Sequence, residues 1–167
     1  MPQKSNTPKE TIEDKSTDQQ SNKNNLFCYE INGIHLFIEL GIKMEILEQS
    51  IIYPIPNAPE WYLGVTSLRS DILTVVNMHF LLDMQQNTKI RRLLKLEHAD
   101  FPPLVIAIDN LPHQRDTTPL ANNSIANETH YPEWITASSK QNNHTFLFAN
   151  HALLFRAMQA TSTSTTD

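Results

Sequence analysis

Short runs of apolar residues, each about as long as one strand, dominate the pattern of hydrophobic and polar positions along the chain. The first two runs, "LFCYEI" (26–31) and "IHLFIEL" (34–40), flank Asn32-Gly33, a dipeptide that tolerates the positive φ angles of a type I′ turn. We therefore predict an antiparallel hairpin. Apolar side chains at 34, 36, 38 and 40 share one face of its second strand, which includes Leu40, and we expect that face to be buried.

Five further runs of strand length continue the pattern: "MEILEQSII", "ILTVV", "RRLLKL", "LVIAID" and "TFLFA". Clusters of Pro, Asn, Asp and Ser separate them, and long helical patterns are absent between them. This spacing predicts a mainly β fold built from small barrels. Helices are expected only as a turn around Trp61–Leu63, a short helix in "NMHFLLD" (77–83) and a terminal helix in "NHALLFRAMQ" (150–159), with Asn150 as its cap.

The terminal helix carries an apolar stripe of Leu153, Leu154, Ala157 and Met158. We interpret the stripe as a surface that packs across a barrel. The alternative is a surface that binds a partner protein.

Both ends of the chain lack the apolar residues that a core needs. Residues 1–25 contain one branched apolar residue, Ile12, and "ATSTSTTD" (160–167) contains none. Such segments cannot bury enough surface to offset chain entropy. We predict a disordered leader over 1–25, one folded domain over 26–159 and a disordered tail over 160–167.

Composition narrows the classes of partner. The formal charge of −5 comes from 18 acidic and 13 basic residues, without a basic stripe that would follow a phosphate backbone, so nucleic acid is not an expected partner. The chain has no apolar run of signal-peptide length or of the roughly 18 residues that a membrane span needs. We expect a cytoplasmic protein without membrane insertion.

The residues that usually carry chemistry are few and scattered. Cys28 is the single cysteine, which excludes a disulfide framework, and its place in "LFCYEI" favours a buried strand residue over a reactive thiol. The seven histidines form no compact ligand spacing, and there is no phosphate-binding glycine loop and no G-x-S-x-G motif. The sequence therefore predicts no enzyme, no catalytic residues, no cofactor and no metal site.

One stretch, "NAPEWYLGVTSLRSDILTVVN" (57–77), has a more specific order. Prolines force an extended entry, Trp61 and Leu63 supply large apolar side chains, Gly64 permits a close turn, and "VTSLR" leads to Arg69 just before a predicted buried strand. On chemistry alone, Arg69 is either a surface charge paired with a local carboxylate or an anchor for a protein interface, where arginine is enriched.

This stretch resembles the CheW-like family of chemotaxis coupling proteins. The family pattern, with prolines before a glycine and then N-L-R-G and a buried strand, is followed closely by "PNAPEWYLGVTSLRSDILTVVNMHFLL". Upstream, "KMEIL" is similar to the family's V-x-E segment and aligns Glu45 with it. Downstream, "AIDNLPHQR" and "TFLFANHALL" are similar to the family's late segment and to its closing strand and helix.

The resemblance implies a fold of two five-stranded SH3-like barrels packed side by side, with short helices that include a C-terminal one. It implies a non-catalytic adaptor that links the cytoplasmic tip of a methyl-accepting chemoreceptor to the regulatory domain of a CheA-type histidine kinase, in arrays at the membrane. The partner-binding residues would be Arg69 and Glu45, near the receptor-contacting groove, where the carboxylate can hold the guanidinium in one orientation. Trp61 and Leu68 would also bind the partner.

Three departures from the family pattern indicate a divergent member. Ser70 replaces the glycine after the arginine, Asn77 replaces an aspartate, and His113 replaces a glycine in the late segment. The divergence favours the PilI-like coupling proteins of pilus-linked systems, which control twitching motility, over flagellar CheW. Two other classes stay open: a CheW-like scaffold for a different protein partner, and a small-barrel ligand-binding domain or enzyme.

Overall fold

The computed structural model describes residues 25–48, 50–85, 92–121, 125–126 and 130–163. The predicted leader over 1–25 falls almost entirely outside these residues. The elements follow one another as β1 (Asn25–Ile31), β2 (Ile34–Phe37), β3 (Lys43–Leu47), β4 (Tyr62–Leu68), β5 (Asp71–Val76), α1 (Met78–Leu81), β6 (Arg92–His98), β7 (Phe101–Ile108), β8 (Asn110–Asp116), α2 (Thr118–Ala121), β9 (Ile125–Ala126), β10 (Ile135–Gln141), β11 (His144–Ala149) and α3 (His151–Thr163).

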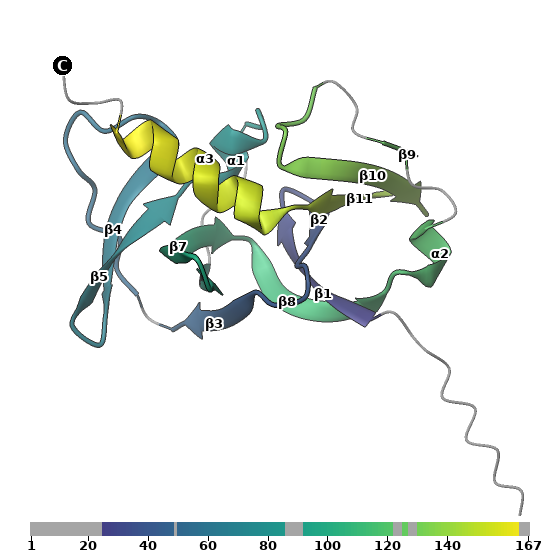
Figure 1. The fold of residues 1–167 in the computed structure, drawn as a ribbon, viewed down its shortest axis with the longest axis horizontal. Coiled ribbons are helices and arrows are strands. Elements are labelled where there is room, and N and C mark those ends of the chain that lie inside the picture. Colours follow the sequence, from purple (N-terminus) through teal and green to yellow (C-terminus); the bar gives the residue numbers. More distant parts are fainter. Residues whose placement is uncertain (1–24, 49, 86–91, 122–124, 127–129, 164–167) are drawn as a thin grey trace, which may run out of the picture.

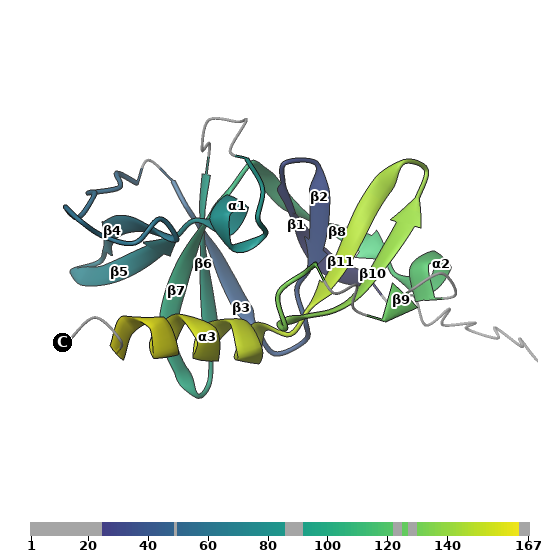
Figure 2. The same cartoon turned by 90° about the horizontal axis from the view of Figure 1, so that it is seen from above.

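The strands form two sheets that lie side by side, and α3 runs from their junction along the sheet that contains β7 (Figures 1 and 2). One sheet has the order β3-β6-β7-β5-β4, and the other has the order β8-β1-β2-β11-β10-β9. The predicted mainly β architecture of two halves packed side by side is confirmed, and the short strand β9 adds a sixth strand to the second sheet. We call the half built on the first sheet barrel 1 and the half built on the second sheet barrel 2.

Three clusters of apolar side chains form the core, two inside the separate barrels and one between them. Small clusters fill each half, one around Val75 and Val105 in barrel 1 and one around Phe37 and Phe146 in barrel 2. The largest cluster lies between them, because alternate residues of the same strands, such as Leu36 beside Phe37, face the other way. The halves therefore share one core.

The predicted hairpin is present, but its burial differs from the expectation. Asn32 and Gly33 have φ angles of 48° and 80°, as a type I′ turn requires, and β1 pairs with β2 around them. Leu40, expected on the buried face, is 87% exposed because β2 ends at Phe37. His35 and Phe37, on the opposite face, are buried, so β2 packs on both sides.

The short helices are confirmed in part. Asn77 caps α1, where its side chain accepts a hydrogen bond from the backbone N–H of Phe80 at 3.4 Å. The expected helical turn at 61–63 is wrong, since β4 begins at Tyr62 and pairs with β5 there. Strands β8 and β10 and helix α2 had no counterpart among the predicted elements.

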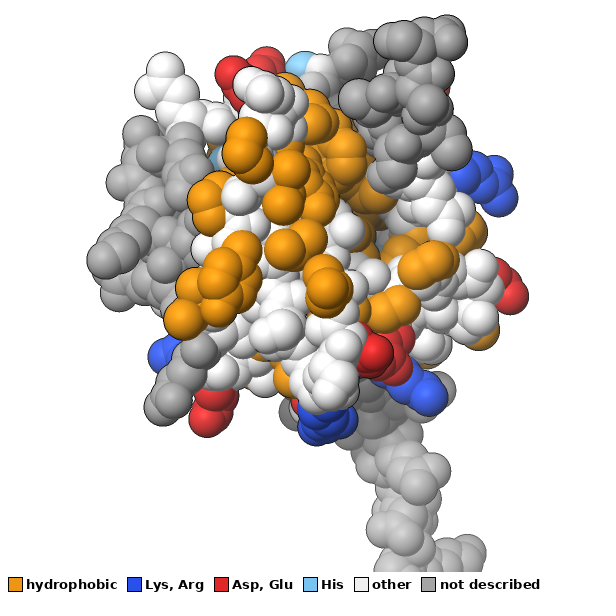
Figure 3. Space-filling view, turned by 90° about the vertical axis from the view of Figure 1, so that its left-hand side faces the viewer, with side chains coloured by type: hydrophobic (Ala, Val, Ile, Leu, Met, Phe, Trp, Pro, Cys, Tyr) orange, Lys and Arg blue, Asp and Glu red, His pale blue; other side chains and the backbone are white. Residues whose placement is uncertain are grey.

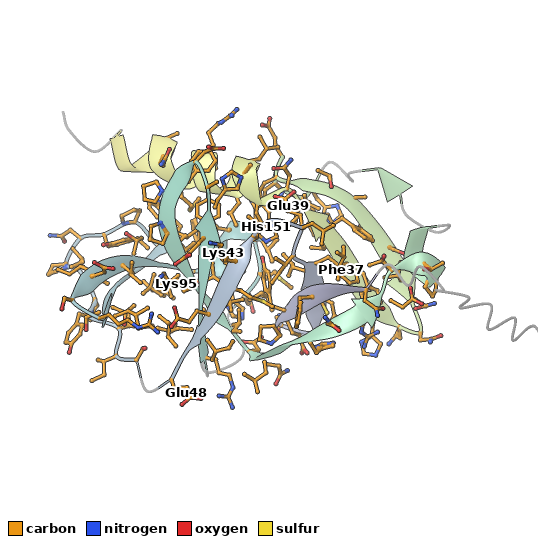
Figure 4. The ribbon with its side chains drawn as sticks, turned by 60° about the horizontal axis from the view of Figure 1, so that its bottom comes forward. Phe37, Glu39, Lys43, Glu48, Lys95 and His151 are labelled. Carbon is orange, nitrogen blue, oxygen red and sulfur yellow. The ribbon has the colours of Figure 1, made fainter. Side chains whose placement is uncertain are left out.

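Helix α3 begins where predicted and covers the junction of the barrels. Asn150 accepts a hydrogen bond from the N–H of Leu153 at 2.9 Å, and Glu39, from the loop after β2, accepts one from the N–H of His151 at 2.7 Å (Figure 4). Of the predicted stripe, Leu154 and Met158 are buried in the shared core, whereas Leu153 is partly exposed. The helix continues to Thr163, past the predicted end at 159.

The buried ring of His151 at the start of α3 makes folding sensitive to acid. Burial lowers the pKa of this imidazole to about 4, although the nearby Glu39 carboxylate opposes the shift. In the unfolded chain a histidine has a pKa of about 6.5, so between pH 6.5 and 4 the unfolded state binds a proton that the folded state does not. We expect the free energy of unfolding to fall across this window by on the order of 3 kcal/mol from His151 alone.

Urea unfolding between pH 7 and pH 4 measures this effect. The control variant is His151→Phe, which removes the titrating imidazole and keeps an aromatic ring in the buried site. The variant should lose less stability over the same range. Equal pH dependence in both proteins would contradict the assignment.

No helix among the described residues is both long enough and apolar enough to cross a membrane.

Candidate functional site

The turn between β4 and β5 presents Arg69 at its tip. Leu68 and Asp71 pair across the hairpin, which leaves Arg69 and Ser70 as its two central residues. Their φ angles are 49° and 79°, so both are in the left-handed region and the turn has the positive φ angles of a type I′ turn. The arginine therefore projects from a short turn whose two strands fix its position.

Ser70 is strained at this turn, because a side chain makes the left-handed conformation costly. We expect Ser70→Gly to raise the free energy of unfolding by about 1 kcal/mol, since glycine adopts this φ readily. Ser67→Gly, at an exposed position on β4 of the same hairpin, is the matched control and should lower stability by about 0.5–1 kcal/mol. Chemical denaturation of both variants measures the difference, and a destabilised Ser70→Gly would show that the turn is not strained.

Glu45 on β3 forms an ion pair with Arg69, which lies far from it in the sequence. Nη2 of Arg69 donates a hydrogen bond to Oε1 of Glu45 at 2.9 Å, although 24 residues separate the two along the chain. Glu45 pairs in register with Lys95 on β6, whose Nζ lies 3.9 Å from the other carboxylate oxygen of Glu45. The carboxylate thus lies between two cations, and the Arg69–Glu45 pair predicted from the family resemblance forms.

Lys95 also links this pair to Glu97. Its Nζ lies 2.5 Å from Oε1 of Glu97, and this hydrogen bond and the lysine charge lower the pKa of the Glu97 carboxyl. Lys43 and Lys95 lie on the neighbouring strands β3 and β6 (Figure 4). The result is a series of alternating charges, Arg69, Glu45, Lys95 and Glu97, that crosses from the β4–β5 turn over β3 to β6.

The Arg69–Glu45 pair is too exposed to matter greatly for folding. The Arg69 side chain is 78% exposed, and ion pairs of this kind contribute at most about 1 kcal/mol. One carboxylate contact leaves most of the five N–H donors of the guanidinium facing solvent. Such a group can bind a carboxylate or backbone carbonyls of a partner protein while Glu45 holds its orientation.

Of the other two predicted site residues, Leu68 lies next to this pair and Trp61 lies apart from it. Leu68 is partly buried against the apolar cluster inside barrel 1, directly beneath the turn. Trp61 packs against the shared core, and its carbonyl accepts a hydrogen bond from the N–H of Asn77 at 2.7 Å. The structure therefore brings Arg69, Glu45 and Leu68 to one region and places Trp61 beside α3.

Trp61 lines an apolar groove between barrel 1 and α3. The groove has a volume of about 450 Å³, and its lining consists of Trp61, Thr74, Pro102, Pro103, Leu104, Phe155, Met158 and Gln159. This lining contains no ionisable side chain, so the groove offers neither a general acid nor a general base.

The β4–β5 end of the molecule is also rich in apolar side chains (Figure 3). On β5 and the segment before β4, Ile51, Tyr53, Ile55 and Ile72 are among the exposed large apolar residues. We call these four residues the apolar end. Apolar surface next to an exposed arginine is the composition of a protein interface.

Barrel 1 closes at this end beside Gly64, where the segment after β3 pairs with β4. The backbone groups of Tyr53 and Val65 exchange hydrogen bonds of 2.8 and 2.9 Å, which joins the segment after β3 to β4. Gly64 has a φ angle of 136°, and a Cβ there would lie 2.2 Å from the carbonyl oxygen of Tyr53. The close approach of these two chain segments therefore requires glycine.

A second cluster was missed by the sequence analysis. Cys28 is buried as predicted, but one ligand atom each from Cys28, His35 and His113 lies within 4.8 Å of the others. The three residues come from three strands with no compact spacing in sequence, so only strand pairing reveals them.

Comparisons with known proteins agree with this geometry. The model of the CheW-like domain family matches residues 25–159. Among solved structures, the chain is similar to the crystal structure of scaffolding protein TtCheW from Thermoanaerobacter tengcongensis, with a TM-score of 0.56 and 16% sequence identity. The alignment covers 75% of this chain and 88% of that chain, and at this identity the likeness concerns the fold. No curated protein matches the chain in sequence.

Proposed function

Because the chain belongs to the CheW-like domain family, we propose that it is a non-catalytic adaptor in a chemosensory signalling array. It would bind the cytoplasmic tip of a methyl-accepting chemoreceptor and the regulatory domain of a CheA-type histidine kinase. It would act in the cytoplasm, at arrays that the receptors anchor to the membrane. The family match over residues 25–159 is the observation that carries this proposal.

The receptor side of the proposal rests on the turn at Arg69. Glu45 orients the guanidinium through one hydrogen bond of 2.9 Å and leaves its other donors open. A receptor tip that presents carboxylates or helix C-terminal carbonyls would accept hydrogen bonds from those donors. Leu68, beneath the turn, supports it from inside the barrel.

The kinase side of the proposal rests on the apolar end. Its exposed side chains would pack against a barrel of the kinase regulatory domain, and burial of apolar surface would supply most of the binding free energy. Trp61, in the groove beside α3, lies on the same half of the molecule and would extend this contact.

We further propose that the array controls type IV pilus twitching. The support is the divergence of the chain from the family pattern at Ser70, Asn77 and His113. Deletion of the gene in its own host should then shrink twitching zones and leave flagellar swimming unchanged. Loss of swimming with normal twitching would assign the protein to a flagellar array.

Calorimetric titrations with each partner test the adaptor proposal. The purified chain should bind both the kinase regulatory domain and a receptor tip fragment with micromolar or tighter affinity. Binding to neither would leave a CheW-like scaffold for a different protein. Turnover of a small molecule would instead favour the enzyme class, which no group in the apolar groove supports.

A further inference from the structure

Three side chains that can bind metal converge in barrel 2, away from the Arg69 turn. Cys28 is on β1, His35 on β2 and His113 on β8, and the order β8-β1-β2 makes these strands neighbours. Phe37 pairs with Cys28, and side chains alternate along a strand, so His35 is on the same face of the sheet as Cys28. His113 is the partner of Cys28 on the other side.

We propose that Cys28, His35 and His113 bind one Zn²⁺ ion through one thiolate sulfur and two imidazole nitrogens. Zinc favours this donor set and binds it tetrahedrally, with bonds of about 2.3 Å to sulfur and about 2.0 Å to nitrogen, which places the two ligand atoms about 3.5 Å apart. Sγ of Cys28 and Nε2 of His113 are 3.5 Å apart. One edge of the coordination tetrahedron is therefore already present.

His35 is a buried imidazole that lacks a partner at one nitrogen. It is 5% exposed, stacks on Phe146 at 5.0 Å, and its Nδ1 makes no hydrogen bond to any described residue. Unpaired buried polar atoms are rare in proteins. Burial also lowers the pKa of His35, because it disfavours the charged form of the ring.

Cys28 must lose its proton when zinc binds. Its side chain is buried, which raises the pKa of the thiol to about 11, and in the metal-free protein the thiol donates a hydrogen bond to the carbonyl oxygen of His113 at 3.6 Å. On binding, the S–H bond breaks, the S–Zn bond forms and the proton goes to solvent. Zinc affinity should therefore decrease as the pH falls.

Other charged and titratable groups surround the site. Nε of Arg115 donates a hydrogen bond to Nε2 of His113 at 3.5 Å, and its guanidinium lies 5.0 Å above the Phe146 ring. This cation repels zinc and must release His113 when the ion binds. Glu30 lies opposite His35 in the β1–β2 pair, and its negative charge offsets part of that repulsion. The ring of His144 is 5.4 Å from that of His35, so His144 is placed to become a fourth ligand.

The zinc ion would join β8, at the edge of its sheet, to β1 and β2. A ligand that binds only the folded state raises its stability by mass action. The site would therefore make the stability of barrel 2 depend on zinc.

Cobalt is the probe for this site, because a cobalt–thiolate bond produces charge-transfer absorption and the chain has a single cysteine. Titration of the full chain with Co²⁺ should give this absorption with an end point of one ion per chain, and Zn²⁺ should abolish it.

Three variants test the proposed ligands and their surroundings. Cys28→Ala should lose the signal. His113→Asn should weaken affinity at least about tenfold, since even outer-shell changes at metal sites cost that much. Arg115→Gln should tighten it by about tenfold, because a nearby positive charge is removed.

His98→Asn, in the other sheet, is the matched control and should bind Co²⁺ as the unchanged protein does. Circular dichroism of each metal-free variant checks folding. If Cys28→Ala does not fold, the partly exposed positions His113 and Arg115 decide the question. Absence of the charge-transfer signal in the unchanged protein, or unaltered affinity in His113→Asn, would overturn the proposal.

Discussion

Gly64→Ala is expected to lower the free energy of unfolding by about 4 kcal/mol, from backbone strain and overpacking together. The added Cβ would lie 2.2 Å from the carbonyl oxygen of Tyr53 and 2.9 Å from Cα of Pro54. These are backbone atoms, which cannot turn aside as a flexible side chain can. Relief of the contact would break the Tyr53–Val65 bridge that closes barrel 1.

Gly41→Ala is the matched control for this variant. Gly41 also has a positive φ, 96°, but a Cβ there would meet no atom within 4 Å. It should therefore lose only about 1–2 kcal/mol from backbone strain. Chemical denaturation of the two variants separates the contributions, and equal losses would show that the approach of Tyr53 does not constrain residue 64.

Arg69→Ala is expected to weaken binding of the receptor tip by about tenfold or more, because truncation of an interface arginine commonly costs about 2 kcal/mol. The fold should be nearly unaffected, since the Arg69–Glu45 pair is exposed and worth at most about 1 kcal/mol. Calorimetry with the receptor fragment measures the first effect and urea unfolding the second.

Arg156→Ala, at an exposed position on α3, is the control for loss of a surface arginine and should bind the receptor normally. Retained kinase binding in Arg69→Ala would assign the turn to the receptor. A large loss of stability with unchanged receptor binding would instead make Arg69 a structural residue.

Local patterns were enough to predict the elements that local chemistry determines. Asn32-Gly33 favours its turn by backbone conformation alone, and Asn150 caps α3 with its own side chain. Strand β10 was missed because its sequence, "ITASSKQ", is largely polar, although Ser138 and Ser139 are buried. Residues 135–141 form a strand because they pair with β11. The sequence of this segment alone carries no information about that pairing.

The candidate site shows the same limit. Arg69 was singled out by its place before a buried strand, but its contact with Glu45 was expected only through the family resemblance. The pair depends on the closure of barrel 1, which brings β3 to the β4–β5 turn. The grouping of Cys28 with His35 and His113 depends on strand order in the same way.

The central claim is that this chain joins a receptor to a kinase, and analytical ultracentrifugation of a labelled receptor tip tests it most directly. The tip is sedimented with the kinase regulatory domain, with this chain, and with both together. The account predicts a heavier boundary containing all three components, which Arg69→Ala reduces and Arg156→Ala does not. If the tip sediments in the full mixture as it does alone, the chain does not couple these two proteins.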